Sequence, residues 1–325
     1  MKKKSIEKKD SRTKKIEKLV TKQALKERLL ELGIEHFTDK TIERIYNCAN
    51  FLRVVFNFEN NGVGSSKIVK ANRCKNRFCP VCSATRARKD GYMLNVILKY
   101  LKNKFNYSFL FLTLTVPNVE SEELVNELDK QYASLKRLLQ RKEFKKISKG
   151  YIRKTEITYN IKRDDYHPHI HMLIAVDSSY FNSRNFVKRD KWLEIWRECS
   201  RNDKITQVDI RKANESSFRE LCKYEAKDTD FLMYSQEVFD TFYRALKGRK
   251  TLTFNGCFQV AKKKYKNEEL NDFKENDDIE YTHISSHAYN YIKSNYKLLS
   301  EREMTRKEFQ EYNNMKIMEE EIIED

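Results

Sequence analysis

Three of the six histidines in the chain stand two apart in the segment HPHIHMLI, residues 167–174. Side chains two apart point about 200° around a helix but lie on the same face of a strand, so this spacing favours a strand. His169 and His171 then share one face. The opposite face is wholly apolar and consists of Ile170, Met172, Ile174 and Val176. The segment therefore predicts a strand of a packed sheet that presents paired imidazoles on one face.

The paired imidazoles favour a metal site, because imidazole is a common metal ligand and two on one strand face can chelate one ion. The alternative is a polar edge strand whose histidines bind nothing. The segment YIRKTEITYN, residues 151–160, predicts a second strand, and NIKRDDYH predicts the turn between the two. If that turn centres near residues 162–164, Glu156 lies across from His169 or His171, with Cβ atoms about 5 Å apart. Glu156 is then a third ligand, or else an exposed strand charge paired with a lysine.

The cysteines suggest a second metal site. The chain has seven cysteines, and three of them, Cys74, Cys79 and Cys82, lie in NRCKNRFCPVCSATRARK. The CPVC turn can direct two thiolates at one zinc ion, and a structural zinc site has four ligands, so Cys48 in IYNCANFL is the fourth candidate. The alternatives are buried small hydrophobic residues or a thiol redox pair.

The charge of the chain indicates a polyanionic partner. Lys and Arg number 65 against 48 Asp and Glu, a net charge of +17, which favours nucleic acid over an acidic membrane surface. A lysine-rich proteome is the alternative explanation of the excess. The candidate DNA-binding residues surround the cysteines and are Arg77, Arg86, Arg88 and Lys89. No apolar run reaches the ~18 residues of a membrane span, and no apolar stretch follows the charged N-terminus, so we expect a cytoplasmic protein.

Four regions are expected along the chain. These are a basic arm and helix at 1–40, a zinc-binding and DNA-contacting segment at 41–90, an α+β domain at 91–235, and a helical, charged region at 236–325. Within the α+β domain, helices are expected at 90–104 and 121–141, and further strands at 108–118 and 205–211. The low counts of Gly and Pro, 7 and 3, agree with a chain rich in helices.

A last helix of the α+β domain carries candidate catalytic residues. Ser217 and Glu220 match a capping box, so this helix begins at 217 or 218. Glu220, Tyr224 and Lys227 are spaced i, i+4 and i+7 on its polar side, opposite an apolar side that includes Leu221. The alternative is a capping glutamate, a partly exposed tyrosine and a solvated lysine.

The segments FLTLTVPN, HPHIHMLI and ELCKYEAKDTD occur in this order after the cysteine cluster. This combination resembles the replication initiators of small rolling-circle plasmids of Gram-positive bacteria (Rep class 1), within the HUH endonuclease superfamily. The resemblance runs from about Cys48 to about residue 235, with a weaker likeness through ALKGRKTLTFNGCF. It implies an α+β fold with a central antiparallel sheet of about five strands flanked by helices, related to the ferredoxin-like and RNA-recognition folds.

The resemblance also implies an activity, which is metal-dependent nicking and joining of DNA at a plasmid origin through a 5′-phosphotyrosyl intermediate. It assigns the divalent metal to His169 and His171, with Glu156 matching the third position. It further implies Tyr224 as nucleophile, Glu220 as the residue that assists termination, and Lys227 near the phosphate. The expected cofactors are Mn²⁺ or Mg²⁺ for catalysis and a structural Zn²⁺ at the cysteines.

The expected partners are origin DNA, as a single-stranded hairpin nick site with flanking duplex, and the host helicase and DNA polymerase. No membrane partner is expected, and the oligomeric state stays open. Three other functions remain: a zinc-containing nucleic-acid-binding regulator without catalysis, a hydrolase that uses water, and an HUH transposase or relaxase. The extended charged ends depart from the family pattern, which leaves the origin sequence open.

Overall fold

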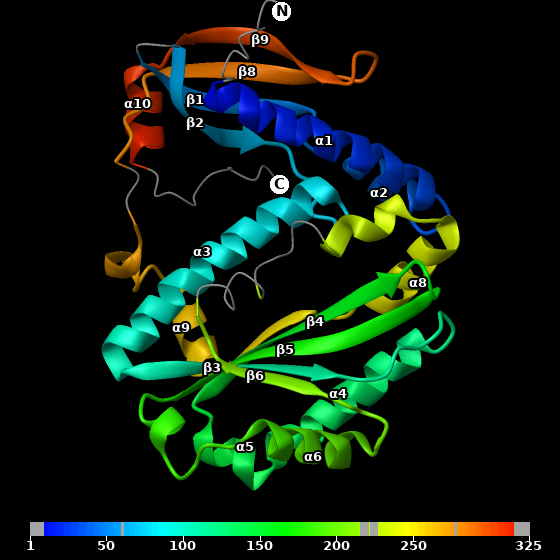
Figure 1. The fold of residues 1–325 in the computed structure, drawn as a ribbon. Helices are drawn as coiled ribbons and strands as arrows, with labels where there is room; N and C mark the ends of the chain where they lie inside the picture. The colour runs from blue at the N-terminus through cyan, green and yellow to red at the C-terminus, as the bar shows by residue number, and fades with distance from the viewer. Residues whose placement is uncertain (1–9, 60–61, 215–220, 222–226, 276–277, 315–325) are drawn as a thin grey trace, which may run out of the picture. The chain divides into compact units, whose positions relative to one another are not determined.

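Two antiparallel sheets organise the chain, one in each of two units (Figure 1). The structure is a computed structural model that describes residues 10–59, 62–214, 221, 227–275 and 278–314. The first unit comprises Met1–Arg86 and Lys274–Asp325, and the second comprises Ala87–Phe273.

The second unit contains a five-stranded sheet of order β6-β3-β5-β4-β7. Its strands are β3 (Tyr107–Thr115), β4 (Gly150–Asn160), β5 (Asp165–Asp177), β6 (Val208–Lys212) and β7 (Leu252–Gly256). All four neighbouring pairs are antiparallel. The predicted α+β class with a five-stranded antiparallel sheet is therefore confirmed, and the strands predicted at 108–118, 151–160 and 205–211 lie within three residues of their observed bounds.

Both faces of this sheet are covered. The apolar face of β5, which includes Ile170 and Met172, packs with Trp192 and Trp196 in one buried cluster. The helices on this side are α4 (Leu124–Gln140), α5 (Lys142–Ile147) and α6 (Arg189–Ser200), seen below the sheet in Figure 1. On the other face, residues of α3 (Pro80–Phe105) and α9 (Cys257–Lys266) form a second cluster with β5. The strand that carries the histidines is therefore central and buried on both sides.

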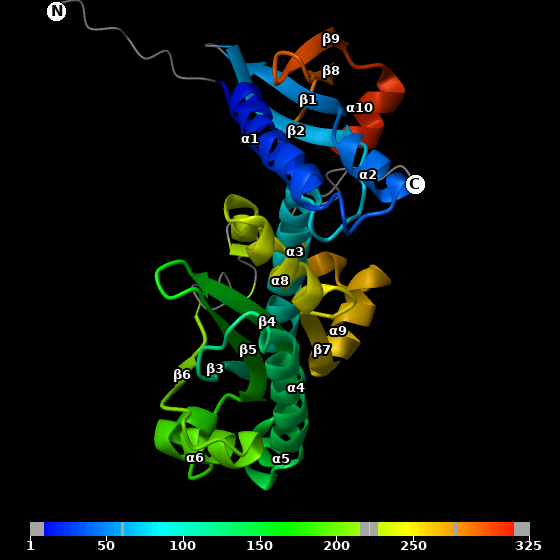
Figure 2. The ribbon, with the colours of Figure 1, turned by 90° about the vertical axis from the view of Figure 1, so that its right-hand side faces the viewer.

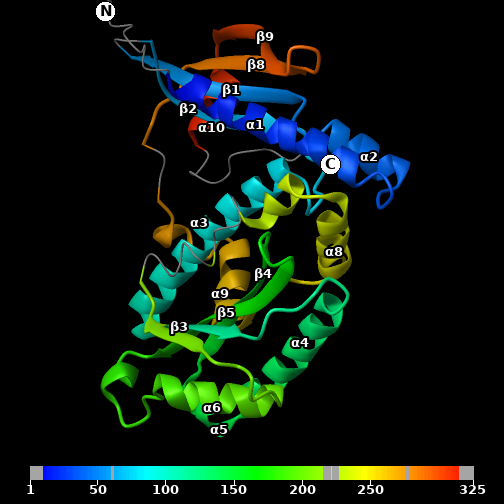
Figure 3. The same cartoon turned by 45° about the vertical axis from the view of Figure 1, so that its right-hand side comes forward.

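The second unit also contains shorter elements. These are η1 (Tyr180–Asn182), η2 (Lys227–Met233), α8 (Gln236–Leu246) and η3 (Asn271–Phe273). Helix α8 lies beside α4, as Figure 3 shows.

A tight turn sets the register of the β4–β5 hairpin. The side-chain oxygen of Asn160 accepts hydrogen bonds from the backbone N–H groups of Lys162 and Arg163. Asp164 has φ 53°, a left-handed conformation that Asp tolerates better than most residues. The turn thus lies at the predicted position, and the register pairs Glu156 with His169.

The first unit contains a four-stranded sheet of order β2-β1-β8-β9. Its strands are β1 (Phe51–Glu59), β2 (Gly62–Ala71), β8 (His283–Asn290) and β9 (Asn295–Glu303). Its helices are α1 (Ser11–Leu32), α2 (Asp39–Tyr46) and α10 (Arg306–Asn313). Helix α1 packs along β2 (Figure 2), and Tyr312 of α10 belongs to a buried cluster with Val55 and Val69.

The prediction of a helical region over 236–325 is wrong for β7, β8 and β9. Charged residues and scarce Gly and Pro suggested helix there, but β8 pairs with β1, which lies more than 200 residues earlier in the chain. Edge strand β9 is mostly exposed, so charged side chains are tolerated on it and its strand pattern is weak. The second unit also extends past residue 235, because β7 pairs with β4.

Candidate metal centres

The β4–β5 hairpin brings one carboxylate and two imidazoles together on one face of the five-stranded sheet. Nε2 of His171 lies 3.2 Å from Oε2 of Glu156, and Nε2 of His169 lies 3.6 Å from the same oxygen. One ligand atom from each of the three residues lies within 4.8 Å of the others. The three residues are 4 to 8% exposed. Buried polar groups that converge in this way form a compact set of metal donors.

The Nδ1 atom of each imidazole lies within hydrogen-bond distance of an oxygen atom. Nδ1 of His169 lies 3.2 Å from the carbonyl oxygen of His167, which can only accept, so Nδ1 carries the proton. Nδ1 of His171 lies 3.1 Å from Oγ1 of Thr113 on β3. Outer-shell bonds of this kind fix the ring and leave Nε2 as the donor to a metal. Both Nε2 atoms face Oε2 of Glu156.

This donor set fits a divalent ion. Imidazole and carboxylate together suit Mn²⁺, Zn²⁺ or Co²⁺, whereas Mg²⁺ prefers oxygen ligands. Three protein ligands leave coordination positions for water or substrate, as in catalytic sites. His167 follows the same alternation, but it is not part of the converging group, and burial lowers its pKa.

Sequence reasoning did not identify Thr113 and Lys154 as residues of this site. The register pairs each of them with His171, from β3 and β4 respectively. The alternating pattern of each strand predicts which face of that strand the residue occupies. Only the pairing of three strands brings both residues beside the histidine. Lys154 is 1% exposed, an unusual burial for a lysine.

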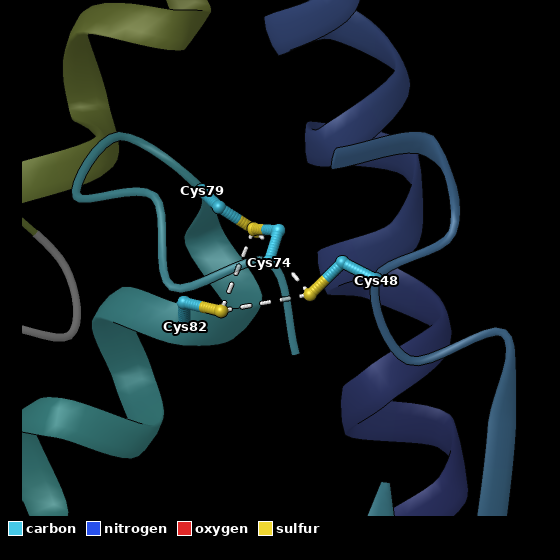
Figure 4. A group of neighbouring side chains, drawn as sticks. All are labelled: Cys48, Cys74, Cys79 and Cys82. Atoms are coloured by element: carbon cyan, nitrogen blue, oxygen red, sulfur yellow. Dashed lines mark hydrogen bonds between the residues drawn. The ribbon is translucent and has the colours of Figure 1, made fainter. Parts of the chain in front are cut away.

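The four predicted cysteines converge in the first unit, with their sulfur atoms directed toward one another (Figure 4). Sγ of Cys82 lies 3.5 Å from Sγ of Cys48 and 3.6 Å from Sγ of Cys74, and Sγ of Cys79 lies 3.8 Å from that of Cys48. Four sulfurs held about 2.3 Å from one zinc ion in a tetrahedron are about 3.8 Å apart. The cluster therefore has the dimensions of a tetrathiolate zinc site, and all four residues are buried free thiols.

Local structure explains this convergence. Cys79 and Cys82 flank the start of α3, which begins at Pro80, a residue suited to the first position of a helix. Cys48 follows α2 in a turn that is held by α1. Nζ of Lys26 donates to the carbonyl oxygens of Tyr46 at 2.7 Å and Cys48 at 3.2 Å.

The electrostatics of the thiols agree with a site for a cation. Hydrogen bonding with Cys48, contacts with the other two thiols and burial raise the pKa of Cys79 well above its ordinary value. Hydrogen bonds from Cys48 and the other two thiols lower the pKa of Cys82. Four buried thiols thus resist full ionisation by themselves, and a bound cation would favour the thiolate form of all four.

The predicted DNA-binding residues lie at and after the cysteine turn. Arg77 precedes Phe78 in the turn, and its guanidinium carbon is 5.7 Å from the centroid of that ring. Arg86, Arg88 and Lys89 lie on the first ten residues of α3, and none of the three is buried. None of the helices in the described ranges has an apolar stretch long enough to cross a membrane.

The predicted nucleophile Tyr224 and its neighbour Glu220 lie outside the described residues, as does the side chain of Lys227, whose backbone begins η2. Leu221 is described. It is buried in the cluster that contains Phe111 and Leu173, on the sheet face that also carries His171.

Comparison with known proteins identifies the family. A family model described as "Replication protein" matches residues 65–299, which include the three residues of the hairpin site and three of the four cysteines. A "Protein rep" of Staphylococcus aureus is 43% identical over 202 residues, which are 61% of this chain and 87% of that protein. A "Protein rep" of Streptococcus pneumoniae serotype 2 (strain D39) is 32% identical over 261 residues, 78% of each chain. No solved structure matches this chain significantly. The chain therefore belongs to the Rep_1 family of replication proteins.

Proposed function

We propose that the protein initiates rolling-circle replication of a plasmid by nicking and rejoining one DNA strand at the origin. Membership of a replication protein family supports a role in replication. The observation that carries the enzymatic proposal is the convergence of Glu156, His169 and His171, with both imidazoles oriented by outer-shell oxygens. A regulator that only binds DNA has no use for this buried donor set.

Glu156, His169 and His171 would hold Mn²⁺ or Mg²⁺, with Mn²⁺ preferred because two of the ligands are nitrogen atoms. When bound, the ion would polarise a non-bridging oxygen of the scissile phosphodiester and orient it for attack.

Tyr224 is the proposed nucleophile. Leu221, three residues before Tyr224 in the chain, packs on the sheet face that carries the hairpin site. Its oxygen would attack phosphorus and form a 5′-phosphotyrosyl ester, while the bond from phosphorus to the 3′ oxygen breaks. The 3′-hydroxyl so released would serve as a primer for the host polymerase. Because the pKa of tyrosine is near 10, a cation such as Lys227 would assist by favouring the phenolate.

Glu220 is proposed to end the reaction. After one circuit a second cleavage is needed while the tyrosine is occupied, and a carboxylate one helical turn earlier could remove a proton from water. If that water carries out the second cleavage, the protein does not need a second tyrosine as nucleophile.

The second unit would be the nicking and joining domain, and the four cysteines of the first unit would hold a structural zinc ion. Arg77, Arg86, Arg88 and Lys89 would contact phosphates of the duplex that flanks the nick site. The strand to be nicked would be single-stranded in a hairpin at the origin, and a host helicase and DNA polymerase would be partners in replication.

Covalent adduct formation tests this proposal. The protein is incubated with Mn²⁺ and a labelled single-stranded oligonucleotide from a plasmid origin, then separated on a denaturing gel. Wild type is expected to carry the label at protein mass, and Tyr224→Phe is expected to lose it. The matched control is Tyr234→Phe, which removes a hydroxyl from a tyrosine that packs against Tyr159.

Each outcome assigns a function. An adduct that persists in Tyr224→Phe would mean that another residue is the nucleophile. Cleavage without any adduct would indicate a hydrolase that uses water. Binding of origin DNA without cleavage would favour a zinc-containing regulator, for which the compact cysteine cluster is the supporting observation.

A further inference from the structure

A lysine lies in the hairpin site beside the three metal donors. Lys154 is opposite His171 in the register of β4 and β5, and it precedes Glu156 by two residues on the same face of the strand. Directly paired residues have Cβ atoms about 5 Å apart, so the ammonium group has the reach to meet a ligand of the metal site. Neither the spacing of histidines nor the family motifs quoted above include this residue.

Lys154 lies deep in the sheet. It is 1% exposed, in a strand flanked by β5 and β7, and burying an ammonium group in a sheet interior is costly. The three metal donors are nearly as buried, at 4 to 8% exposed, so the lysine is at a depth similar to theirs. Lys149, just before β4, pairs with Asp177 at 3.0 Å and its side chain is 37% exposed.

The charges of the proposed reaction favour a lysine on this sheet face. A divalent ion together with the Glu156 carboxylate has a net charge of about +1. The scissile phosphodiester and an attacking phenolate together carry about −2. Lys154 adds positive charge on the same sheet face, in addition to the proposed Lys227, and low polarity there strengthens its effect on an anion.

We propose that Lys154 is a phosphate-binding residue of the site, whose ammonium group donates to a non-bridging oxygen of the scissile phosphodiester. This inference rests on the proposed nicking function and adds a second contact to the same phosphate. It predicts opposite effects of Lys154 on the two ligands of the site, because a cation attracts the phosphate but repels the metal ion.

Two binding measurements test the proposal. In a Tyr224→Phe background, which prevents cleavage, the affinity for a single-stranded origin oligonucleotide is measured by fluorescence anisotropy with saturating Mn²⁺. Mn²⁺ affinity is measured separately, without DNA, from the electron paramagnetic resonance signal of the free ion. The variants are Lys154→Met, which keeps the length of the side chain, Lys154→Arg, which keeps the charge, and Lys149→Met as the matched loss of one exposed charge.

The expected result is about 10- to 100-fold weaker oligonucleotide binding in Lys154→Met, the loss typical of a hydrogen bond to a charged group. Mn²⁺ binding in the same variant should be equal to that of the parent or tighter. Lys154→Arg should retain most of the oligonucleotide affinity, and Lys149→Met should change it less than threefold.

Two results would overturn the inference. Weaker binding of Mn²⁺ and oligonucleotide together in Lys154→Met would assign Lys154 a structural role in shaping the site. Unchanged oligonucleotide binding would exclude the phosphate contact. If Lys154→Met does not fold, the test rests on Lys154→Arg, which keeps the positive charge. A loss of oligonucleotide affinity in folded Lys154→Arg would contradict a role for that charge. The nicking proposal is tested separately by the adduct of the wild type, which does not depend on these affinities.

Discussion

Replacing Thr113 by Val should weaken metal binding without disturbing the sheet. Oγ1 of Thr113 lies 3.1 Å from Nδ1 of His171, and His171 is 4% exposed. Valine has nearly the same shape and a high preference for strands, so β3 should persist. A buried polar group that loses its partner costs about 1 to 3 kcal/mol, and removal of an outer-shell partner of a ligating histidine typically lowers metal affinity about 10- to 100-fold. A factor of 10 to 100 corresponds to about 1.4 to 2.7 kcal/mol, so the two estimates agree.

The assay is a Mn²⁺ titration of adduct formation, with direct Mn²⁺ binding measured in parallel. Thr113→Val should move the titration to about 10- to 100-fold higher Mn²⁺ and reach nearly the same plateau, because the ligands themselves remain. Thr115→Val is the matched control, since Thr115 is two residues later on the same face and its hydroxyl donates to the carbonyl oxygen of Gln207. If the two variants have the same Mn²⁺ affinity, the argument that Thr113 orients His171 is refuted.

Three further predictions concern the two metal sites and the first unit. Glu156→Gln keeps the size of the side chain but replaces the anionic ligand by a poor neutral one. Mn²⁺ affinity should therefore fall by more than about 100-fold, and the adduct should disappear at micromolar Mn²⁺. A Mn²⁺ titration equal to that of the wild type would show that Glu156 is not a metal ligand. Cys79→Ser should lower the zinc content, measured by atomic emission, from one equivalent per chain to a small fraction and lower the unfolding temperature, whereas Cys199→Ser in the second unit should keep its zinc. Burial lowers the pKa of His287 to about 4, below the ordinary value near 6.5, so the unfolded chain gains a proton that the folded chain does not take up until lower pH. The contribution of His287 to stability should therefore be greatest above pH 6.5 and fall on the order of 2 to 3 kcal/mol as the pH drops toward 4. His287→Gln should show a shallower decline of the unfolding temperature, and an equal decline would contradict the assignment.

The hairpin site could be predicted from sequence because its information is local. A strand has a period of two residues, so His169 and His171 had to share a face, and a turn of few residues limited the partner of Glu156 to one of the two histidines. The register then pairs Glu156 with His169, while Glu156 Oε2 lies nearer to Nε2 of His171. The cysteine turn is local in the same sense, since Cys79 and Cys82 are one helical turn apart at the start of α3.

The partners of distant strands could not be predicted from the sequence. Strand β8 joins β1 across more than 200 residues, and no periodicity within either segment specifies that partner. The positions of Thr113 and Lys154 beside His171 likewise depend on which strands neighbour β5, an outcome of packing both sheet faces under helices. Sequence alone determined which residues share a face and which side chains can bind a metal, because those properties follow from backbone geometry and side-chain chemistry. Only the tertiary structure decided which faces meet, because that choice minimises the exposed apolar surface of the whole chain.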